Sequence, residues 1–137
     1  MVKRVVAFNN EKPQERDSFL DNQSHKVARV LETWRLKFET IAMTKCGGSS
    51  LEHARQNASQ VLPMLKLRWQ SHEDDKVSCA DVLKQLRTRA DVVELIILSI
   101  NVAHNAVTTH GLFSADAEAR LYMMGRVMDY YHVPCRL

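Results

Sequence analysis

The sequence has few residues that form turns and few that form cross-links. Only 4 glycines and 3 prolines occur in 137 residues, which leaves little turn material for a fold of many short strands and favours long helices. The three cysteines, Cys46, Cys79 and Cys135, are far apart, odd in number and not arranged as a CxxC pair. We therefore expect reduced thiols and a chain held together by its apolar core.

Signals for secretion and for membrane insertion are also missing. The N-terminus lacks the long apolar core of a secretory signal. The most apolar stretch, residues 92–107, is interrupted by polar side chains and is shorter than the roughly 20 apolar residues of a membrane span. We expect a cytoplasmic protein in a reducing compartment, with no membrane segment.

No motif for catalysis or for cofactor binding is present. The sequence contains no GxSxG elbow, no phosphate-binding GxxxxGK[ST] or GxGxxG loop, and no HExxH or ExxH pair on a helix. His132 and Cys135 form a local H-x-x-C pair, but a structural zinc site usually has four ligands in close pairs. We predict no catalytic residue, no cofactor and no metal.

What the sequence does contain is apolar periodicity. Hydrophobic residues make up 45% of the chain and charged residues 26%, as in a packed globular domain. Residues 92–107 carry two apolar stripes, which indicates a helix buried nearly all round. We predict an all-α, single-domain bundle of four to five helices over residues 24–137, built around this central helix, with residues 1–23 as an extended N-terminal arm.

Spacings of three and four define the outer helices. We expect one from Ser24, as its N-cap, to Lys45, and a second from about Ser50 that Pro63 kinks or breaks at residues 60–63. The last helix is predicted at residues 115–132, with Ser114 as its cap. The anchors expected to pack these helices around the central one are Trp34, Trp69 and Met124.

The extent of the central helix has two interpretations. An unbroken apolar stripe from Cys79 to Ile97 favours one helix over about 79–110, ended by Gly111. Against this, Thr88 and Asp91 would cap a separate, shorter helix. We expect the continuous helix, which would overhang a small bundle and invite a second subunit.

Polar residues interrupt the central stretch: Ser99, Asn101, His104, Asn105 and Thr108. Each needs a hydrogen-bond partner if it is buried. If the hydrogen-bond partners lie in the same chain, these residues belong to a hydrogen-bonded core. If the partners lie across a symmetry axis, the helix is a dimer seam, that is, the contact between two subunits. For His104, a hydrogen-bonded core histidine is the favoured interpretation.

The last helix carries methionine and tyrosine on both faces, more apolar surface than a small monomer readily covers. Its Gly125 would let a neighbour approach closely. The residues predicted to contact a partner are Tyr122, Met123, Met128 and Tyr130. We expect a small non-enzymatic adaptor or regulatory protein that binds another protein and associates with itself as a homodimer.

The alternative is a small nucleic-acid-binding accessory protein. The net charge is +3 and the pI about 8.9, a mild excess of the kind that phosphate contacts need. The basic residues predicted for this role are Lys3, Arg4, Lys84 and Arg87. No helix-turn-helix, zinc-finger or RNA-binding motif accompanies them, and acidic residues interleave with them.

Overall fold

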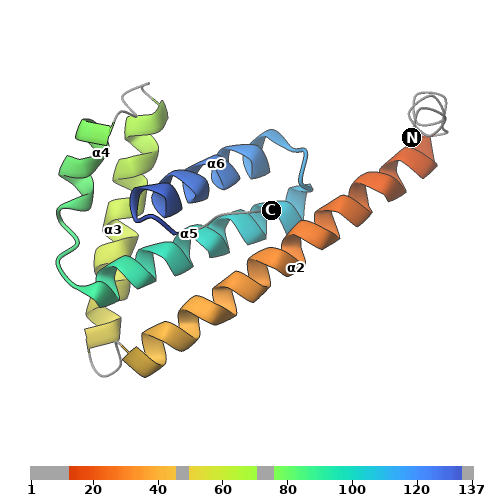
Figure 1. Cartoon of the computed structure of the whole chain (residues 1–137). Coiled ribbons are helices and arrows are strands. Elements are labelled where there is room, and N and C mark those ends of the chain that lie inside the picture. The colour runs from red at the N-terminus through yellow and green to blue at the C-terminus, as the bar shows by residue number, and fades with distance from the viewer. Residues whose placement is uncertain (1–12, 46–49, 71–75, 134–137) are drawn as a thin grey trace.

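The structure, a computed structural model, describes residues 13–45, 50–70 and 76–133. Over these ranges the chain forms helices joined by short turns, which confirms the all-α bundle around a central helix (Figure 1). The helices are α2 (Pro13–Lys45), α3 (Ser50–Gln70), α4 (Lys76–Leu83), α5 (Arg89–His110) and α6 (Ala115–Tyr130).

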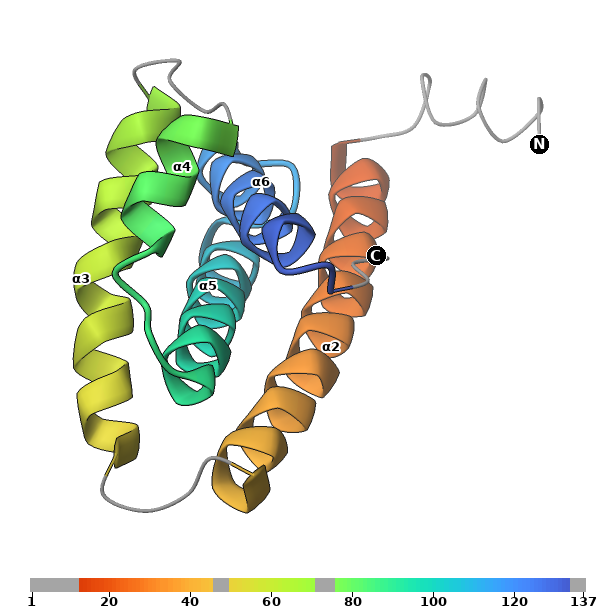
Figure 2. The same ribbon diagram turned by 60° about the vertical axis from the view of Figure 1, so that its left-hand side comes forward.

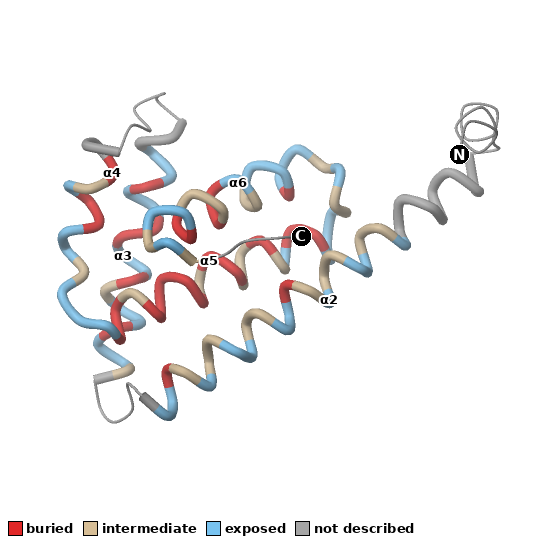
Figure 3. Tube along the Cα trace, in the orientation of Figure 1, coloured by how far each residue is buried: buried red, intermediate tan, exposed pale blue. Residues whose placement is uncertain are grey.

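Helix α5 is the centre of the molecule. It contacts α2, α3 and α6, and it lies between them in both views of the ribbon (Figures 1 and 2). Most of its residues are buried, whereas α2 is mainly exposed along its outer side (Figure 3). The predicted burial of residues 92–107 follows from this position, because apolar side chains on every side of α5 meet a neighbouring helix.

The predicted continuous helix over about 79–110 is wrong, because the chain leaves the helical path between α4 and α5. Thr88 is extended, with φ −116° and ψ 160°, and forms a reciprocal capping box with Asp91. This is the alternative that the Thr88 and Asp91 pair indicated. In a continuous helix, backbone carbonyls would accept hydrogen bonds from the N–H groups at this point, but here the capping side chains accept them instead. A separate helix can therefore begin at Arg89 even though the apolar stripe continues across the boundary.

The N-terminal part of α2 also differs from the prediction. Residues 13–23, expected to belong to an extended arm, are helical, and Ser24 lies inside α2 and does not cap it. Proline is favoured in the first turn of a helix, so Pro13 suits the observed start. The Ser24 hydroxyl accepts a hydrogen bond from the backbone N–H of Leu112, at 2.9 Å, and so ties α2 to the turn after α5. Residues 1–12 of the predicted arm lie outside the described residues.

Helix α3 runs through Pro63 without a break. Pro63 is exposed, so the carbonyl oxygen of Ser59, which loses its intrahelical N–H partner, is on a side that water can reach. The apolar face of α3 lies against α5 as predicted, with buried residues Ala54, Ala58, Val61, Leu62 and Leu65. Trp34 of α2 packs half-buried against the core, while the side chain of Trp69 lies outside the described part.

The end of α5 and the start of α6 follow the prediction. Gly111 ends α5 with φ 86°, and its N–H donates to the Val107 carbonyl. The Ser114 hydroxyl caps α6 by accepting from the Ala117 N–H. Helix α6 ends at Tyr130, two residues earlier than expected, and Met124 is fully buried.

One helix in the described part, Arg89–His110, is long and apolar enough to cross a membrane. It is α5, the buried core helix of the bundle, and 56% of its most apolar window is covered by the rest of the chain. This burial is consistent with a soluble protein.

A candidate binding cleft between α2, α3 and α5

A cleft of about 490 Å³ opens where the C-terminal half of α2 and the N-terminal half of α3 flank α5. Its apolar lining comes from all three helices: Ala42, Met43, Leu51, Ala58, Ile97 and Leu98. Its polar lining is Glu39, Arg55, Ser59, Glu94 and Asn101. Apolar side chains make up slightly more than half of the lining, and polar groups make up the rest. A concave volume of several hundred Å³ that combines apolar and polar side chains is suited to binding.

The sequence creates this cleft by placing small residues where α2 and α3 approach α5. Ala42 and Ala58 are almost completely buried, and neither is large enough to fill the space beside α5. Ala42, Val93 and Ile97 form a small core of their own, separate from the main one. Met43 projects from the rim and is 73% exposed, which leaves apolar surface in contact with water at the mouth of the cleft.

Glu94 is the charged group of α5 in this cleft. Its side chain is only 7% exposed, and its ion-pair partner is Arg55 of α3, with Nε and Oε2 3.5 Å apart. Arg55 itself is 67% exposed and so remains largely solvated. Burial raises the pKa of the Glu94 carboxyl above its usual range, Arg55 lowers it in part, and the charge of Glu39 raises it again.

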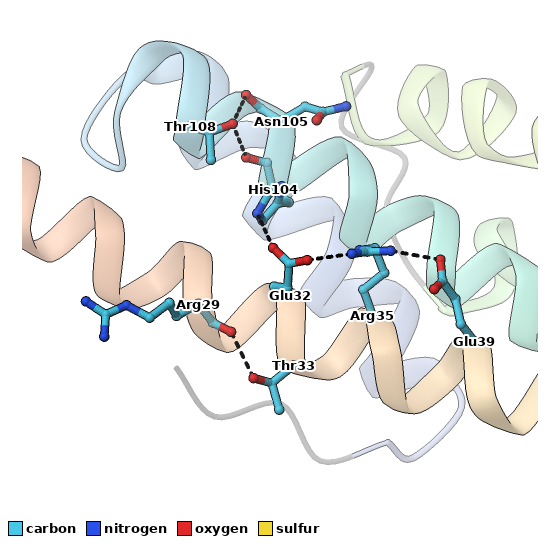
Figure 4. Close-up of polar contacts among 8 residues, drawn as sticks. All are labelled: Arg29, Glu32, Thr33, Arg35, Glu39, His104, Asn105 and Thr108. Carbon is cyan, nitrogen blue, oxygen red and sulfur yellow. Dashed lines mark hydrogen bonds and ion pairs between the residues drawn. The ribbon is translucent and has the colours of Figure 1, made fainter.

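A second set of charged side chains extends from Glu39 in the cleft along the contact between α2 and α5 (Figure 4). His104 of α5 lies 3.7 Å from Glu32, and Arg35 bridges Glu32 at 2.6 Å and Glu39 at 3.0 Å. The hydrogen bonds that the Arg35 guanidinium donates to these two carboxylates raise the pKa of Arg35. Glu39 therefore has a cation on its own helix, whereas Glu94 depends on a solvated arginine of another helix.

This arrangement is suited to binding a cationic group. A buried carboxylate in an apolar wall attracts a cationic group that carries apolar surface of its own. Among the described residues, no three histidine, cysteine or acidic side chains are close enough together to hold a metal ion.

The residues predicted for partner binding on α6 are divided between surface and core. Tyr122 and Tyr130 are exposed, and their role in binding stays a prediction. Met123 and Met128 are 4% and 0% exposed because they pack in the main core, so in this structure neither presents its side chain to solvent. A side chain at Gly125 would meet nothing within 4 Å, so no described helix of the same chain approaches this glycine closely.

The basic residues predicted for nucleic-acid binding do not form one described surface. Lys84 and Arg87 are exposed in the connection between α4 and α5, whereas the predicted continuous helix would have placed both on one helix. The Arg87 backbone N–H donates to Asp91, which fixes this turn. Lys3 and Arg4 lie outside the described residues.

Two of the polar residues of α5 find hydrogen-bond partners in their own helix. The Ser99 hydroxyl donates to the Ile96 carbonyl at 2.8 Å, and the Thr108 hydroxyl lies within 3.1 Å of the carbonyls of His104 and Asn105. Ser99 is therefore a satisfied core residue, whereas Asn105 and Thr108 are exposed. A dimer seam along α5 stays a prediction. His104 is not a core histidine, because its half-buried side chain faces Glu32 at the edge of the bundle.

Sequence reasoning missed Glu94 and Arg55. The available signal was an acidic residue inside the most apolar stretch, flanked by Val93 and Leu95. A buried acid at that place needs a cation or a ligand. Its partner Arg55 lies on another helix, and no local spacing indicates such a pair.

Comparison of the chain with protein-family models, with curated proteins and with solved structures finds no match.

Proposed function

We propose that this chain is a small non-enzymatic binding protein of the cytoplasm that holds a segment of another protein in the cleft between α2, α3 and α5. The observation that supports this proposal is the buried carboxylate of Glu94 in an open, apolar cleft, paired with a solvated arginine at 3.5 Å. A cytoplasmic location agrees with the buried free thiol of Cys79.

The cleft suits one or two anchoring side chains of a larger partner. Its volume of about 490 Å³ is enough for such anchors and too small for a folded domain. Met43 at the rim and Leu51 in the wall offer further apolar contact to residues that flank the anchor. Binding sites of this kind gain most of their affinity from a few buried anchor residues.

A photo-crosslinking experiment tests the proposal. A benzophenone amino acid replaces Met43 in the full chain, which is expressed in its native host and irradiated. The matched control carries the same group at Phe113, which is also exposed but is not a lining residue of the cleft. We expect a protein adduct from position 43 that position 113 does not give.

Two further variants connect the adduct to the cleft. Ser59→Trp fills the cleft from α3, whereas Gln60→Trp adds the same bulk at the neighbouring exposed position outside it. Ser59→Trp should abolish the adduct and Gln60→Trp should retain it. Half of each sample is treated with nuclease. An adduct that survives Ser59→Trp contradicts the proposal, and one that disappears with nuclease favours the nucleic-acid alternative.

A further inference from the structure

We propose that the occupant of the cleft is the N-terminal segment of a second copy of the chain, residues 2–8, with the sequence VKRVVAF. The segment lies outside the described residues. This inference rests on the proposed function, because it names the partner of the same cleft. It assigns Lys3 or Arg4 as the cation that pairs with Glu94.

The chemistry of the segment complements that of the cleft. The cleft presents two carboxylates, Glu39 and Glu94, and one cation, the largely solvated Arg55, among apolar and neutral polar side chains. The segment presents two cations, Lys3 and Arg4, beside Val5, Val6 and Phe8. An arginine or lysine that reaches Glu94 brings a charge to a buried carboxylate whose present partner is largely solvated.

The length of α2 excludes binding within one copy. Helix α5 runs antiparallel to α2, because Leu112 meets Ser24, His104 faces Glu32, and Glu94 and Glu39 share the cleft. The cleft therefore lies at the C-terminal end of α2. Glu39 is about 39 Å from Pro13 along the helix axis, at 1.5 Å per residue.

Residues 2–8 cannot cover that distance and still fill the cleft. Fully extended, the chain places Phe8 no more than about 18 Å from Pro13, and Arg4 no more than about 32 Å. Neither reaches the level of Glu39 in the same copy. A cleft that contains both the cation and the apolar residues of the segment must therefore belong to another molecule. If two copies each place their N-terminal segment in the cleft of the other, they form a closed two-fold dimer. If each copy binds the segment of the next copy, they form an open chain of molecules.

Crosslinking between labelled copies tests this inference directly. The benzophenone amino acid replaces Phe8 in ¹⁵N-labelled full chain, which is mixed with unlabelled wild type and irradiated. Mass spectrometry then identifies the crosslinked peptides. We expect adducts between labelled and unlabelled chains that map to the cleft residues Met43, Leu51 or Leu98. Adducts confined to one chain, or to another surface, overturn the inference.

The ionic contact is tested by sedimentation velocity over a range of concentrations. The double substitution Lys3→Glu with Arg4→Glu, and separately Glu94→Gln, should each weaken self-association at least tenfold. The matched control, Lys26→Glu with Arg29→Glu, changes net charge equally at two exposed positions on α2 and should retain wild-type association. Circular dichroism confirms that each variant is folded. A monomeric wild type, or equal effects of the two double variants, overturns the inference.

The two proposals fail in different ways. If position 43 captures a different protein and position 8 gives no adduct in the cleft, the cleft is a binding site and its occupant is not this segment. If position 43 gives no adduct that Ser59→Trp abolishes, the cleft is not a binding site and both proposals fall.

Discussion

Asp91 and Glu94 are buried acids three residues apart on α5, yet their surroundings are opposite. Asp91 accepts hydrogen bonds from the backbone N–H groups of Arg87 and Thr88, at 3.1 and 3.3 Å, and from the Asn57 amide at 3.3 Å. Glu94 has a solvated arginine at 3.5 Å. Burial raises the pKa of both, but the hydrogen bonds outweigh it at Asp91, so its pKa lies below the usual range, whereas that of Glu94 lies above it.

The difference separates a structural acid from an acid that can bind. The carboxylate of Asp91 is held by donors of its own chain and fixes the start of α5. Burial removes water from the carboxylate of Glu94, and the contacts that its own chain supplies compensate for this loss only in part. The fold stabilises the charge of the first, and a ligand is needed to stabilise the charge of the second.

The largest expected effect comes from removing the satisfied acid. Asp91→Ala should lower the free energy of unfolding by about 3 kcal/mol, because it leaves three part-buried donors without this acceptor and removes half of the capping box. Urea denaturation at neutral pH measures this change. Asp81→Ala is the control, since Asp81 is exposed on α4 and should change stability by less than about 0.5 kcal/mol.

The pH dependence of this variant adds a second check. A carboxyl whose pKa is lowered in the folded state stabilises the fold above its unfolded pKa, and this contribution disappears as the pH falls through the folded pKa. The difference in the free energy of unfolding between wild type and Asp91→Ala should therefore become smaller below about pH 3.8, the ordinary pKa of aspartate. A gap of constant size would show that the charge of Asp91 contributes nothing.

Removing the other half of the capping box should have a smaller effect. Thr88→Ala eliminates the hydroxyl that accepts the Asp91 N–H at 3.1 Å. We expect a loss of about 1 kcal/mol in the free energy of unfolding, the usual value for an N-cap threonine. Thr88→Ser should restore most of it. If alanine and serine are equally destabilising, the hydroxyl is not the stabilising group.

Glu94→Gln should have an effect of the opposite sign. The amide keeps the size of the side chain and removes a charge whose burial is only partly compensated, so we expect stability at neutral pH to be unchanged or higher by up to about 1 kcal/mol. Because the pKa of Glu94 is raised, the wild type loses stability as the pH rises through that pKa. Any advantage of the variant should vanish below about pH 4.5, where both side chains are neutral. A loss comparable to that of Asp91→Ala would contradict the comparison.

The smallest effect on stability is expected for Arg55→Ala. Arg55 is largely solvated, so its loss should cost only a few tenths of a kcal/mol. Its removal takes away the charge that lowers the pKa of Glu94, so that pKa should rise further. Carbon-13 NMR titration of the Glu94 carboxyl measures the shift. Arg120→Ala, which breaks an ion pair with Asp116 on α6, should leave Glu94 unchanged.

The same comparison shows which features the sequence could predict. Threonine and aspartate three residues apart are a local capping signal, so the start of α5 was visible as an alternative to the continuous helix. Apolar spacing likewise predicted the buried face of α3, and the residue types of Gly111 and Ser114 predicted the end of α5 and the cap of α6. These features depend on residues close together in the sequence.

The cleft depends on residues that only the fold brings together. Arg55 and Glu94 are distant in sequence and on different helices, and the apolar period gives no information about where two helices diverge. The start of α2 was missed for another reason. Its first two turns extend beyond the bundle, so no apolar periodicity marks them as helical (Figure 1).

The central position of α5 has a consequence for local unfolding. Each of α2, α3 and α6 packs on α5, and none of these three has another of them as a main contact. One outer helix can therefore detach while the other two stay in place, but α5 is released only when all of them leave. Amide hydrogens of α5 should exchange with solvent only through global unfolding, and those of each outer helix should also exchange through smaller openings. The backbone hydrogen bonds of α5 would then be among the last in the described part of the chain to open as the protein unfolds.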